Sequence, residues 1–279
     1  MASPSYGPKW WTDKTTAVVT GANKGIGLEI ARILAGQGLH TILTARNREL
    51  GQRAADEVKQ AAGPSSSVEF QQLDISDPAS ISHFAQWLQD QHGSLTLLVN
   101  NAGMAYKGDV FGLPEATATL ATNYFGTVQL TEALLPMMPD HQGRVVTVSS
   151  RAGLTSIIRD PNLRQRFSSA RTTAEVDALA QEFLAAVQRP ELLAPQGWPR
   201  SMYGVSKLCL STYCRTLAAR MEQRGITVNA CCPGWCRTDM SSQGGNKSAA
   251  EGADTPVWLA LRSPDSTGGL WGERRQLAH

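Results

Sequence analysis

A tyrosine stands four residues before a lysine in the stretch SMYGVSK, from Ser201 to Lys207. Residues four apart on a helix lie on the same face, so the Tyr203 phenol and the Lys207 ammonium can approach one bound molecule. A nearby ammonium favours the phenolate form, which moves the pKa of a phenol from about 10 toward neutral pH. The pair is suited to moving a proton. The ordinary alternative is an exposed Tyr–Lys pair on a helix surface.

A glycine-rich turn, TGANKGIG, covers Thr20 to Gly27 and directly follows an apolar run. Glycines at positions 21, 25 and 27 have the spacing of a strand-to-helix turn in which the backbone comes close to a pyrophosphate. A helix that begins there points its N–H groups at the anion. Taken alone, the motif is also compatible with a plain tight turn between a strand and a helix.

Six short runs rich in β-branched residues predict strands, and helical patterns lie between them. Helices are predicted, for example, over Gly27–Gly38 and Ala79–Gly93. The alternation of strands and helices predicts an α/β fold, a doubly wound parallel sheet of the Rossmann type with helices on both faces. The predicted strands are Thr15–Thr20, His40–Ala45, Val68–Leu73, Leu95–Asn100, Arg144–Ser149 and Ile226–Cys231.

Two segments interrupt this alternation, and both follow strands on the side where open α/β sheets bind ligands. Arg151–Met202 is long, polar and helical in pattern, so we expect a helical insertion before Tyr203. Ser241–Asp254 is small and Gly-rich, so we expect a flexible substrate loop. With residues 1–14 as an N-terminal extension, the chain of 279 residues is expected to form a single domain.

Five motifs follow one another in a fixed order, each at the end of a predicted strand or at the start of a helix. Together they resemble the short-chain dehydrogenase/reductase family over about Thr15–Thr238. The resemblance implies an oxidoreductase that uses a nicotinamide cofactor. The motifs are TGxxxGxG at Thr20–Gly27, NNAG at Asn100–Gly103, the serine pair Ser149–Ser150, YGVSK at Tyr203–Lys207 and PGWCRT at Pro233–Thr238.

The active serine and the tyrosine are further apart than in minimal members of this family. Ser150 and Tyr203 are 53 positions apart. The insertion between them, its ending GWPRSMYGVSK and the later NACCPGWCRTDM resemble monomeric NADPH-dependent carbonyl reductases and the plant menthone and salutaridine reductases. In those relatives the insertion covers the helix that other members use for assembly, so the resemblance implies a monomer.

The resemblance also implies a catalytic tetrad of Asn123, Ser150, Tyr203 and Lys207. Hydride transfer to a carbonyl leaves an alkoxide, so the site needs a proton donor and a group that stabilises negative charge on oxygen. Tyr203 would donate the proton, and Lys207 would lower the pKa of the phenol and hold the nicotinamide ribose. Ser150 would polarise the carbonyl, while strand alternation turns Ser149 to the other face. Asn123 would hold a water in a locally opened helix and link Lys207 to solvent; the alternative is a helix-surface amide.

The end of the second predicted strand favours NADPH over NADH. An NAD site places a carboxylate there for the ribose 2′-hydroxyl, whereas a 2′-phosphate needs cations. Here the strand is followed by Arg46, with Arg48 close by and Lys24 in the glycine turn. Each cation alone is compatible with a solvated loop residue, but the loops together offer basic groups without an acid. Arg46 and Lys24 match basic residues of NADPH-using relatives, whereas Arg48 does not clearly align.

Further cofactor contacts follow from the positions of the motifs. Asp74 and Ile75 would hold the adenine, although Asp74 is also compatible with a helix cap. The full set implied by the resemblance is Gly21, Asn23, Lys24, Gly25, Ile26, Gly27, Arg46, Asp74, Ile75, Asn101, Ala102, Gly103, Tyr203, Lys207, Pro233, Gly234, Cys236, Arg237 and Thr238.

Apolar and aromatic residues flank the motifs and are suited to a pocket for a small hydrophobic carbonyl substrate. A ketone, an aldehyde or a quinone fits, and terpenoid or alkaloid ketones and xenobiotic carbonyls remain equal alternatives. Each of these residues is also compatible with core packing. Beside Ser150 they are Met104, Tyr106, Trp198, Trp235 and Met240.

Composition excludes several other functions. The formal net charge is +2 and no long block of like charge occurs, so no nucleic-acid partner is expected. No apolar run approaches the roughly 20 residues of a membrane helix. The N-terminal MASPSYGPKWW lacks the pattern of a secretion signal, so a cytoplasmic protein is expected. Five cysteines without paired Cys-x-x-Cys clusters, and no histidine at ligand spacing, indicate reduced thiols and no metal site.

Two functions of different classes are compatible with these motifs. One is an NADPH-dependent carbonyl reductase; the other is a non-catalytic NADPH-binding redox sensor or interaction module. Sensors of this kind typically lose the tyrosine or the lysine. The chain retains the whole tetrad, which favours the enzyme.

Overall fold

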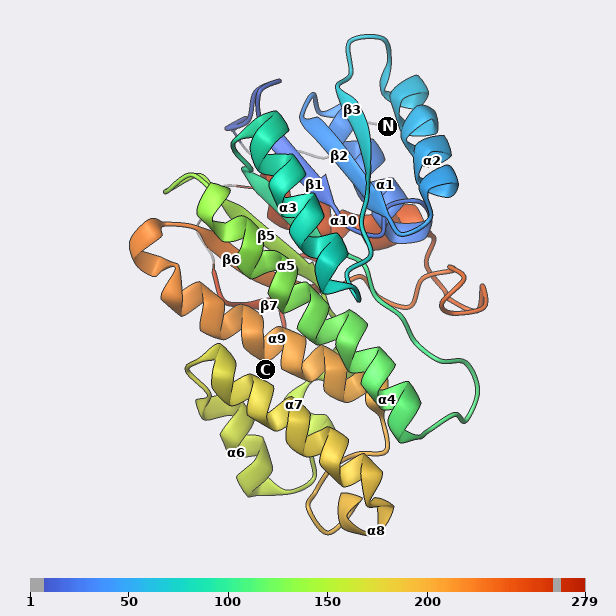
Figure 1. Ribbon diagram of the computed structural model, residues 1–279, viewed down its shortest axis with the longest axis vertical. Coiled ribbons are helices and arrows are strands. Elements are labelled where there is room, and N and C mark those ends of the chain that lie inside the picture. Colours follow the sequence, from blue (N-terminus) through green and yellow to red (C-terminus); the bar gives the residue numbers. More distant parts are fainter. Residues whose placement is uncertain (1–7, 263–266, 279) are drawn as a thin grey trace.

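The strands form one twisted sheet at the centre of the molecule (Figure 1). The computed structural model describes residues 8–262 and 267–278. Within these ranges the sheet has eight strands in the order β3-β2-β1-β4-β5-β6-β7-β8, parallel except for the last pair. The strands are β1 (Thr16–Val19), β2 (His40–Ala45), β3 (Val68–Gln72), β4 (Leu97–Asn100), β5 (Arg144–Val148), β6 (Thr227–Cys232), β7 (Leu270–Gly272) and β8 (Arg275–Gln276).

The six predicted strands are confirmed to within two residues at each end. β7 and β8 were not predicted, because each is too short to show a periodic pattern. β7 extends the parallel sheet beside β6, with Ala230 opposite Leu270, and β8 folds back on it. The doubly wound parallel sheet is therefore confirmed, with one short antiparallel strand at its edge.

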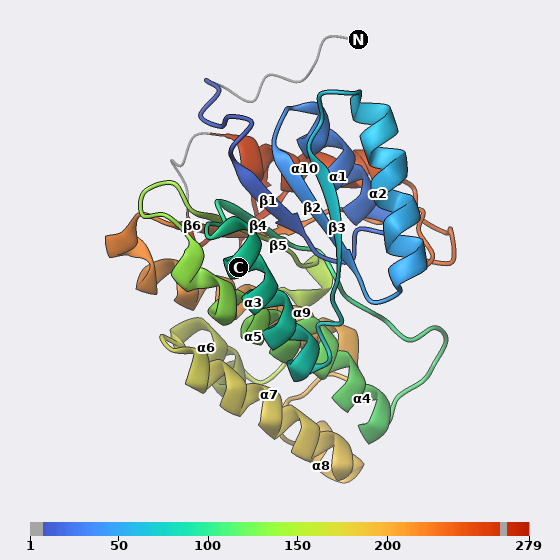
Figure 2. The same cartoon turned by 45° about the horizontal axis from the view of Figure 1, so that its top comes forward.

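Helices cover both faces of the sheet, as the alternation predicts (Figures 1 and 2). Successive strand residues point to opposite faces, so Val18 packs with the helices of one face and Val19 with those of the other. One face is covered by α1 (Gly25–Gly36), α2 (Arg48–Ala62) and α10 (Ala249–Leu261), and the other by α3 (Pro78–His92), α4 (Leu113–Leu120), α5 (Thr127–Leu134) and α9 (Met202–Arg220).

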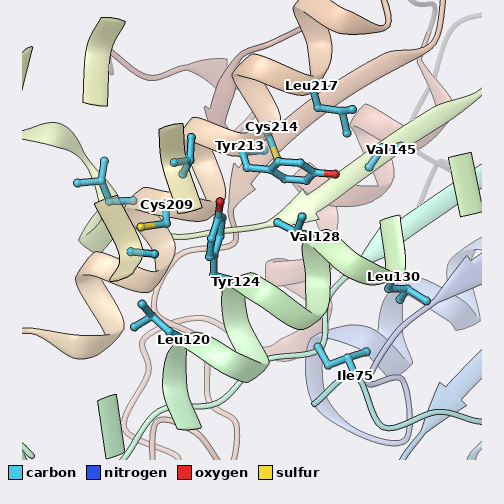
Figure 3. Packing of buried hydrophobic residues seen from close by; sticks show 14 of the residues in the cluster. Ile75, Leu120, Tyr124, Val128, Leu130, Val145, Cys209, Tyr213, Cys214 and Leu217 are labelled. Carbon is cyan, nitrogen blue, oxygen red and sulfur yellow. The ribbon is translucent and has the colours of Figure 1, made fainter. Parts of the chain in front are cut away.

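The insertion before Tyr203 is helical, as predicted, and packs on α9 at the side of the molecule farthest from α2 (Figure 1). Tyr124 donates a hydrogen bond to Asp177 of the insertion at 2.7 Å, and Figure 3 shows Tyr124 beside Cys209 of α9. The insertion contains α6 (Pro161–Ser169), α7 (Thr173–Gln188), α8 (Pro190–Leu193) and the 3₁₀ turns Arg151–Gly153 and Thr155–Ile157.

The predicted flexible loop Ser241–Asp254 is too long by six residues, because α10 already begins at Ala249. Ser248 and Glu251 form a capping box at its start, a local signal that the small-residue composition obscured. The irregular part is also anchored: the Arg237 N–H donates to the Lys247 carbonyl at 2.7 Å, and the Lys247 N–H donates to the Trp235 carbonyl at 3.1 Å. Only the part before α10 is a loop.

The N-terminal extension is packed against the domain where the structure describes it. Trp11 is buried and its indole donates to the Gln37 carbonyl at 2.9 Å. Trp10 donates to the Leu261 carbonyl at 2.9 Å. Residues 1–7 of the predicted extension lie outside the described residues. Among the helices that are described, none has the length and apolar character needed to cross a membrane.

Candidate active site

The Tyr203 phenol and the Lys207 ammonium lie on one face of α9, as their spacing predicts. Ser201 caps the helix by accepting the Gly204 N–H at 3.1 Å, which places Tyr203 in its first turn and Lys207 one turn later. The Lys207 Nζ lies 5.7 Å from the centroid of the Tyr203 ring. It donates to the carbonyl of Val148, at the end of β5, at 2.8 Å. The helix start and the strand end together fix the pair.

The two serines after β5 point to opposite sides. Ser150 lies close enough to the Tyr203 phenol to lower its pKa and is half-buried. Ser149 is buried beneath α9, where its hydroxyl donates to the Lys207 carbonyl at 3.1 Å and meets the Ser211 hydroxyl at 2.7 Å. The structure thus brings Ser150, and not Ser149, to the phenol.

Burial shifts the pKa of both groups of the pair. It lowers the pKa of Lys207 to about 8. It also raises the pKa of Tyr203, against the opposing effect of the hydrogen bond from Ser150. This corrects the expectation of a lowered phenol pKa, because desolvation by burial is the largest effect on Tyr203. The phenol therefore carries its proton at neutral pH.

Asn123 lies in a locally opened helix, as expected. The segment Ala121–Gly126, between α4 and α5, is a π-helical turn. Asn123 is fully buried, so the helix-surface alternative is wrong. Its carboxamide accepts from the Met104 N–H at 2.7 Å and donates to the Met104 carbonyl at 2.9 Å and to the Ser206 hydroxyl at 3.0 Å. Asn123 therefore ties the strand-end loop to α9.

Gly103 lies beside both Asn123 and Lys207. A Cβ atom added to Gly103 would lie 3.2 Å from the Asn123 Oδ1 and 3.5 Å from the Lys207 Nζ. A side chain at this position would fill the gap between them.

The glycine turn forms a cradle for an anion, because two of its glycines are required by their surroundings. Gly21 has a φ of 61°, and an added Cβ would lie 2.9 Å from the Ala102 Cα. At Gly27 a Cβ would lie 2.4 Å from the Asn101 Nδ2. The first N–H groups of α1 are not capped by the Lys24 side chain at the N-cap position. A pyrophosphate fits such uncapped N–H groups at the positive end of a helix.

The NNAG segment is joined to this turn. The Asn101 side chain donates to the carbonyls of Thr20 and Gly21 at 2.9 and 3.2 Å. The backbone N–H groups of Asn101 and Ala102 both donate to the Thr20 hydroxyl, at 3.0 and 2.9 Å. The two predicted cofactor motifs therefore form one rigid unit, with the half-buried Asn23 and Ile26 on its surface.

The basic groups predicted to select NADPH lie around this unit. Arg46 is exposed at the end of β2 and is followed by Asn47, which caps α2. Lys24 makes an ion pair with Asp239 at 2.6 Å, and both side chains are more than half exposed. Sequence analysis missed this acid, because Asp239 is 215 residues away from Lys24 along the chain.

Two aspartates follow β3, and they have different hydrogen-bond partners. Asp74 accepts hydrogen bonds from the backbone and the hydroxyl of Ser76, at 2.9 and 2.6 Å. The cap of α3 is Asp77, which accepts the Ala79 N–H at 3.0 Å, so the helix-cap alternative for Asp74 is wrong. Ile75 is buried in the core, and only a small part of its side chain is accessible.

The loop after β6 approaches the glycine turn. The Thr238 methyl group lies beside Gly25, and Arg237 is exposed. Pro233 is half-buried and Gly234 exposed. The Cys236 thiol is buried and packs against Gly252 of α10, so any contact that Cys236 makes with a cofactor is through its backbone.

Three of the predicted substrate residues are exposed at the surface of the protein. Tyr106, Met240 and Trp235 are exposed, Trp235 by 63%, and Met104 is half-buried beside Asn123. Trp198 is 5% exposed and packs edge-on against Phe167, so its expected place in the pocket is wrong. It is a core residue of the insertion.

Comparison with known proteins identifies the family of the chain. The model of the short chain dehydrogenase family matches residues 15–162, and that described as enoyl-(acyl carrier protein) reductase matches residues 167–257. The chain belongs to the short-chain dehydrogenase/reductase family.

Among its relatives is carbonyl reductase [NADPH] 1 of Rattus norvegicus, 42% identical over 92% of this chain and 94% of the relative. Carbonyl reductase [NADPH] 3 of Mus musculus is 43% identical over 90% of this chain and 92% of the relative. Salutaridine reductase from Papaver somniferum has a similar structure, with a TM-score of 0.83 and 30% identity over 92% of this chain and 99% of that one. Menthone neomenthol reductase from Mentha piperita has a TM-score of 0.80 and 28% identity over 92% of this chain and 98% of that one.

Proposed function

We propose that this protein is an NADPH-dependent carbonyl reductase that reduces a ketone, aldehyde or quinone to an alcohol or hydroquinone. The observation that carries the proposal is the position of the Tyr203 phenol, which lies beside Ser150 and one helical turn from Lys207, whose Nζ is 5.7 Å from the centroid of the ring. The relatives named carbonyl reductase [NADPH] support the choice of reaction and of cofactor. NADPH, when bound, supplies the hydride.

The residues of the chain supply the proton and the orientation of the substrate. The Ser150 hydroxyl donates a hydrogen bond to the carbonyl oxygen and polarises it. Tyr203, protonated at neutral pH because burial raises its pKa, donates its proton to the same oxygen as the alkoxide forms. The Lys207 ammonium stabilises the phenolate that remains. A water held by Asn123, as the family resemblance implies, would then return a proton to the pair.

The cofactor is held by the unit formed from the glycine turn and NNAG. The uncapped N–H groups of α1 bind the pyrophosphate, and Asp74 and Ile75 lie on the adenine side. Arg46 and Lys24 bind the 2′-phosphate, for which Lys24 exchanges Asp239 as its partner. Pro233, Gly234, Arg237 and Thr238 line the nicotinamide end.

The substrate is a small hydrophobic carbonyl compound. Tyr106, Trp235 and Met240 offer exposed apolar surface around the reaction site, and the exposed loop before α10 leaves this surface open. Aromatic and thioether side chains pack against many flat apolar molecules without selecting one shape. Broad tolerance among bulky ketones and quinones is the consequence.

The protein acts as a monomer in a reducing compartment, the cytoplasm. The monomer is supported by the insertion, because α7 packs on α9 and covers the surface through which other family members assemble. The reducing compartment is supported by five cysteines that are free and buried in the structure. Light scattering tests the monomer: a mass of about 30 kDa is expected, and a stable tetramer would contradict it.

Oxidation of NADPH, followed by its near-ultraviolet absorbance in the presence of a panel of quinones and dicarbonyl compounds, tests the reaction. Turnover with at least one compound, and its loss in Tyr203→Phe, is the expected result. The alternative function, a non-catalytic NADPH-binding sensor or interaction module, would appear as tight NADPH binding with no turnover across the panel. The retained tetrad argues against that alternative.

A further inference from the structure

Two histidines and a glutamate meet at the outer edge of the sheet, away from the site described above. His40 is the first residue of β2, Glu69 lies in the neighbouring β3, and His92 is the last residue of α3. β2 and β3 are parallel, with Ile42 opposite Glu69, so both side chains lie near the starts of their strands. The cofactor motifs follow the opposite ends. The cluster is therefore independent of the proposed reaction.

The spacing of the three side chains matches a metal site. The Glu69 Oε2 lies 3.2 Å from the His92 Nε2 and 3.6 Å from the His40 Nε2. Zinc bonds of about 2.0–2.2 Å in a tetrahedron place neighbouring ligand atoms about 3.3–3.6 Å apart. The distance from Glu69 to His40 has this length, and the distance from Glu69 to His92 is slightly shorter. The third distance, between ligand nitrogens of the two imidazoles, is within 4.8 Å.

The imidazole nitrogens are oriented for a ligand. His40 Nδ1 hydrogen-bonds the Ser67 hydroxyl, and when this nitrogen carries the proton the Nε2 lone pair faces the cluster. The Nε2 atoms of both His40 and His92 are buried and, among the described residues, lack a hydrogen-bond partner. Trp87 packs edge-on against the His92 ring, with centroids 5.3 Å apart. Both buried nitrogens lie near the Glu69 carboxylate. Because buried polar atoms normally have a partner, an ion bound by all three side chains would satisfy them.

We propose that His40, Glu69 and His92 bind a divalent transition-metal ion, with Zn²⁺ the ion best suited to two imidazoles and one carboxylate. The Glu69 side chain is 38% exposed, which gives the ion a path from solvent and leaves room for a water as fourth ligand. The ion links β2, β3 and the end of α3, and so stabilises the edge of the sheet. Sequence analysis predicted no metal site, because the ligands are 29 and 23 residues apart and show no motif spacing.

The test uses the full-length protein without a histidine tag, stripped with a chelator and then dialysed against ZnCl₂. Metal analysis should give one zinc per chain. Zinc at about 100 times its Kd should raise Tm by about 5 °C relative to the stripped protein. His92→Gln and Glu69→Gln should each abolish both effects. His83→Gln, which changes an exposed histidine of the same helix, should retain them.

Each variant is compared with its own metal-free Tm, so a less stable variant does not imitate the loss of zinc. Cobalt substitution of the wild-type protein supplies a second measurement that needs no variant. A site with two imidazoles, a carboxylate and a water gives the intense visible absorption of four-coordinate Co²⁺, whereas surface binding gives the weak six-coordinate spectrum. Less than about 0.2 zinc per chain, or an equal rise of Tm in His92→Gln, would overturn the proposal.

Discussion

The Lys24 ammonium lies 2.6 Å from the Asp239 carboxylate and joins the glycine turn to the loop after β6. The contact spans the region where the 2′-phosphate of the cofactor is proposed to bind. It also lowers the pKa of Asp239, so the carboxylate is charged at neutral pH. Asp239 therefore competes with the phosphate for Lys24 and repels it.

Asp239→Asn should strengthen NADPH binding by about 2–5-fold at low salt, since an exposed ion pair makes only a small contribution. The gain should diminish at high salt, where exposed charges are screened. Titration of the tryptophan fluorescence with NADPH measures the Kd. Asp109→Asn, which breaks the exposed ion pair with Arg200, is the matched control and should have no effect. Weaker binding in Asp239→Asn would show that the ion pair organises the site instead.

Cofactor choice should depend on Arg46 and not on its neighbour. Arg46→Asp should raise the KM for NADPH by about 10–150-fold and improve the relative use of NADH, because a charge-assisted contact is worth about 1.5–3 kcal/mol. Arg48→Asp introduces the same charge two residues later and should change KM much less. Steady-state kinetics with both cofactors measure the effect. Equal KM values in the two variants would remove Arg46 from the phosphate site.

The pH dependence of kcat/KM for NADPH should follow the ionisation of Lys207. Burial lowers the pKa of this ammonium to about 8 in the protein without cofactor, so it loses its proton as pH rises through that value. The kcat/KM for NADPH reflects ionisations of the free enzyme and should fall above about pH 8, by up to tenfold per pH unit. A profile that stays level to about pH 9.5 would show that the lysine keeps its charge.

Two tryptophans should behave differently, because one is buried and the other exposed. Trp198→Ala removes a core side chain of the insertion and should cost about 3–5 kcal/mol of unfolding free energy. Trp235→Ala should leave stability nearly unchanged and raise the KM of bulky substrates. Denaturant unfolding and kinetics on the same preparations compare them. A stable Trp198→Ala protein with an altered substrate KM would return Trp198 to the pocket.

Local patterns allowed much of this site to be predicted from sequence. The four-residue spacing of Tyr203 and Lys207 and strand alternation at Ser150 are local and survive folding. Ion pairs between distant residues and the burial of a side chain depend on the whole fold, so short sequence patterns do not predict them. The pairing of Lys24 with Asp239 depends on two loops that only the sheet brings together. The raised pKa of Tyr203 depends on surrounding atoms that no sequence window contains.

The ends of helices and strands, and the packing partners of single side chains, were predicted less well. β7 is only three residues long and is specified by pairing with β6. The start of α10 depends on one capping box within a small-residue segment. Trp198 was placed in the pocket because aromatic residues serve cores and ligands alike, and its contact with Phe167 appears only after the insertion has folded.

The two serines provide a control within the chain for the proposed chemistry. Ser150→Ala removes the hydroxyl that meets Tyr203 and should lower kcat by about 10²–10³-fold, as for loss of one oxyanion donor. Ser149→Ala removes a buried hydroxyl bonded to Lys207 and Ser211 and should have a mild effect on kcat. The ratio of the two kcat values is the measurement. Equal losses would mean that the serines act through the fold and not at the carbonyl.

The central claim is that Tyr203 donates the proton, and Tyr203→Phe tests it most directly. The variant keeps the ring and deletes the hydroxyl, so NADPH should bind with nearly unchanged Kd and Tm should change little. Single-turnover oxidation of bound NADPH by a good quinone or ketone substrate measures the chemical step. Its rate should fall by about 10²–10⁴-fold. A Tyr203→Phe protein that keeps more than about a tenth of the wild-type rate would contradict the proposed mechanism.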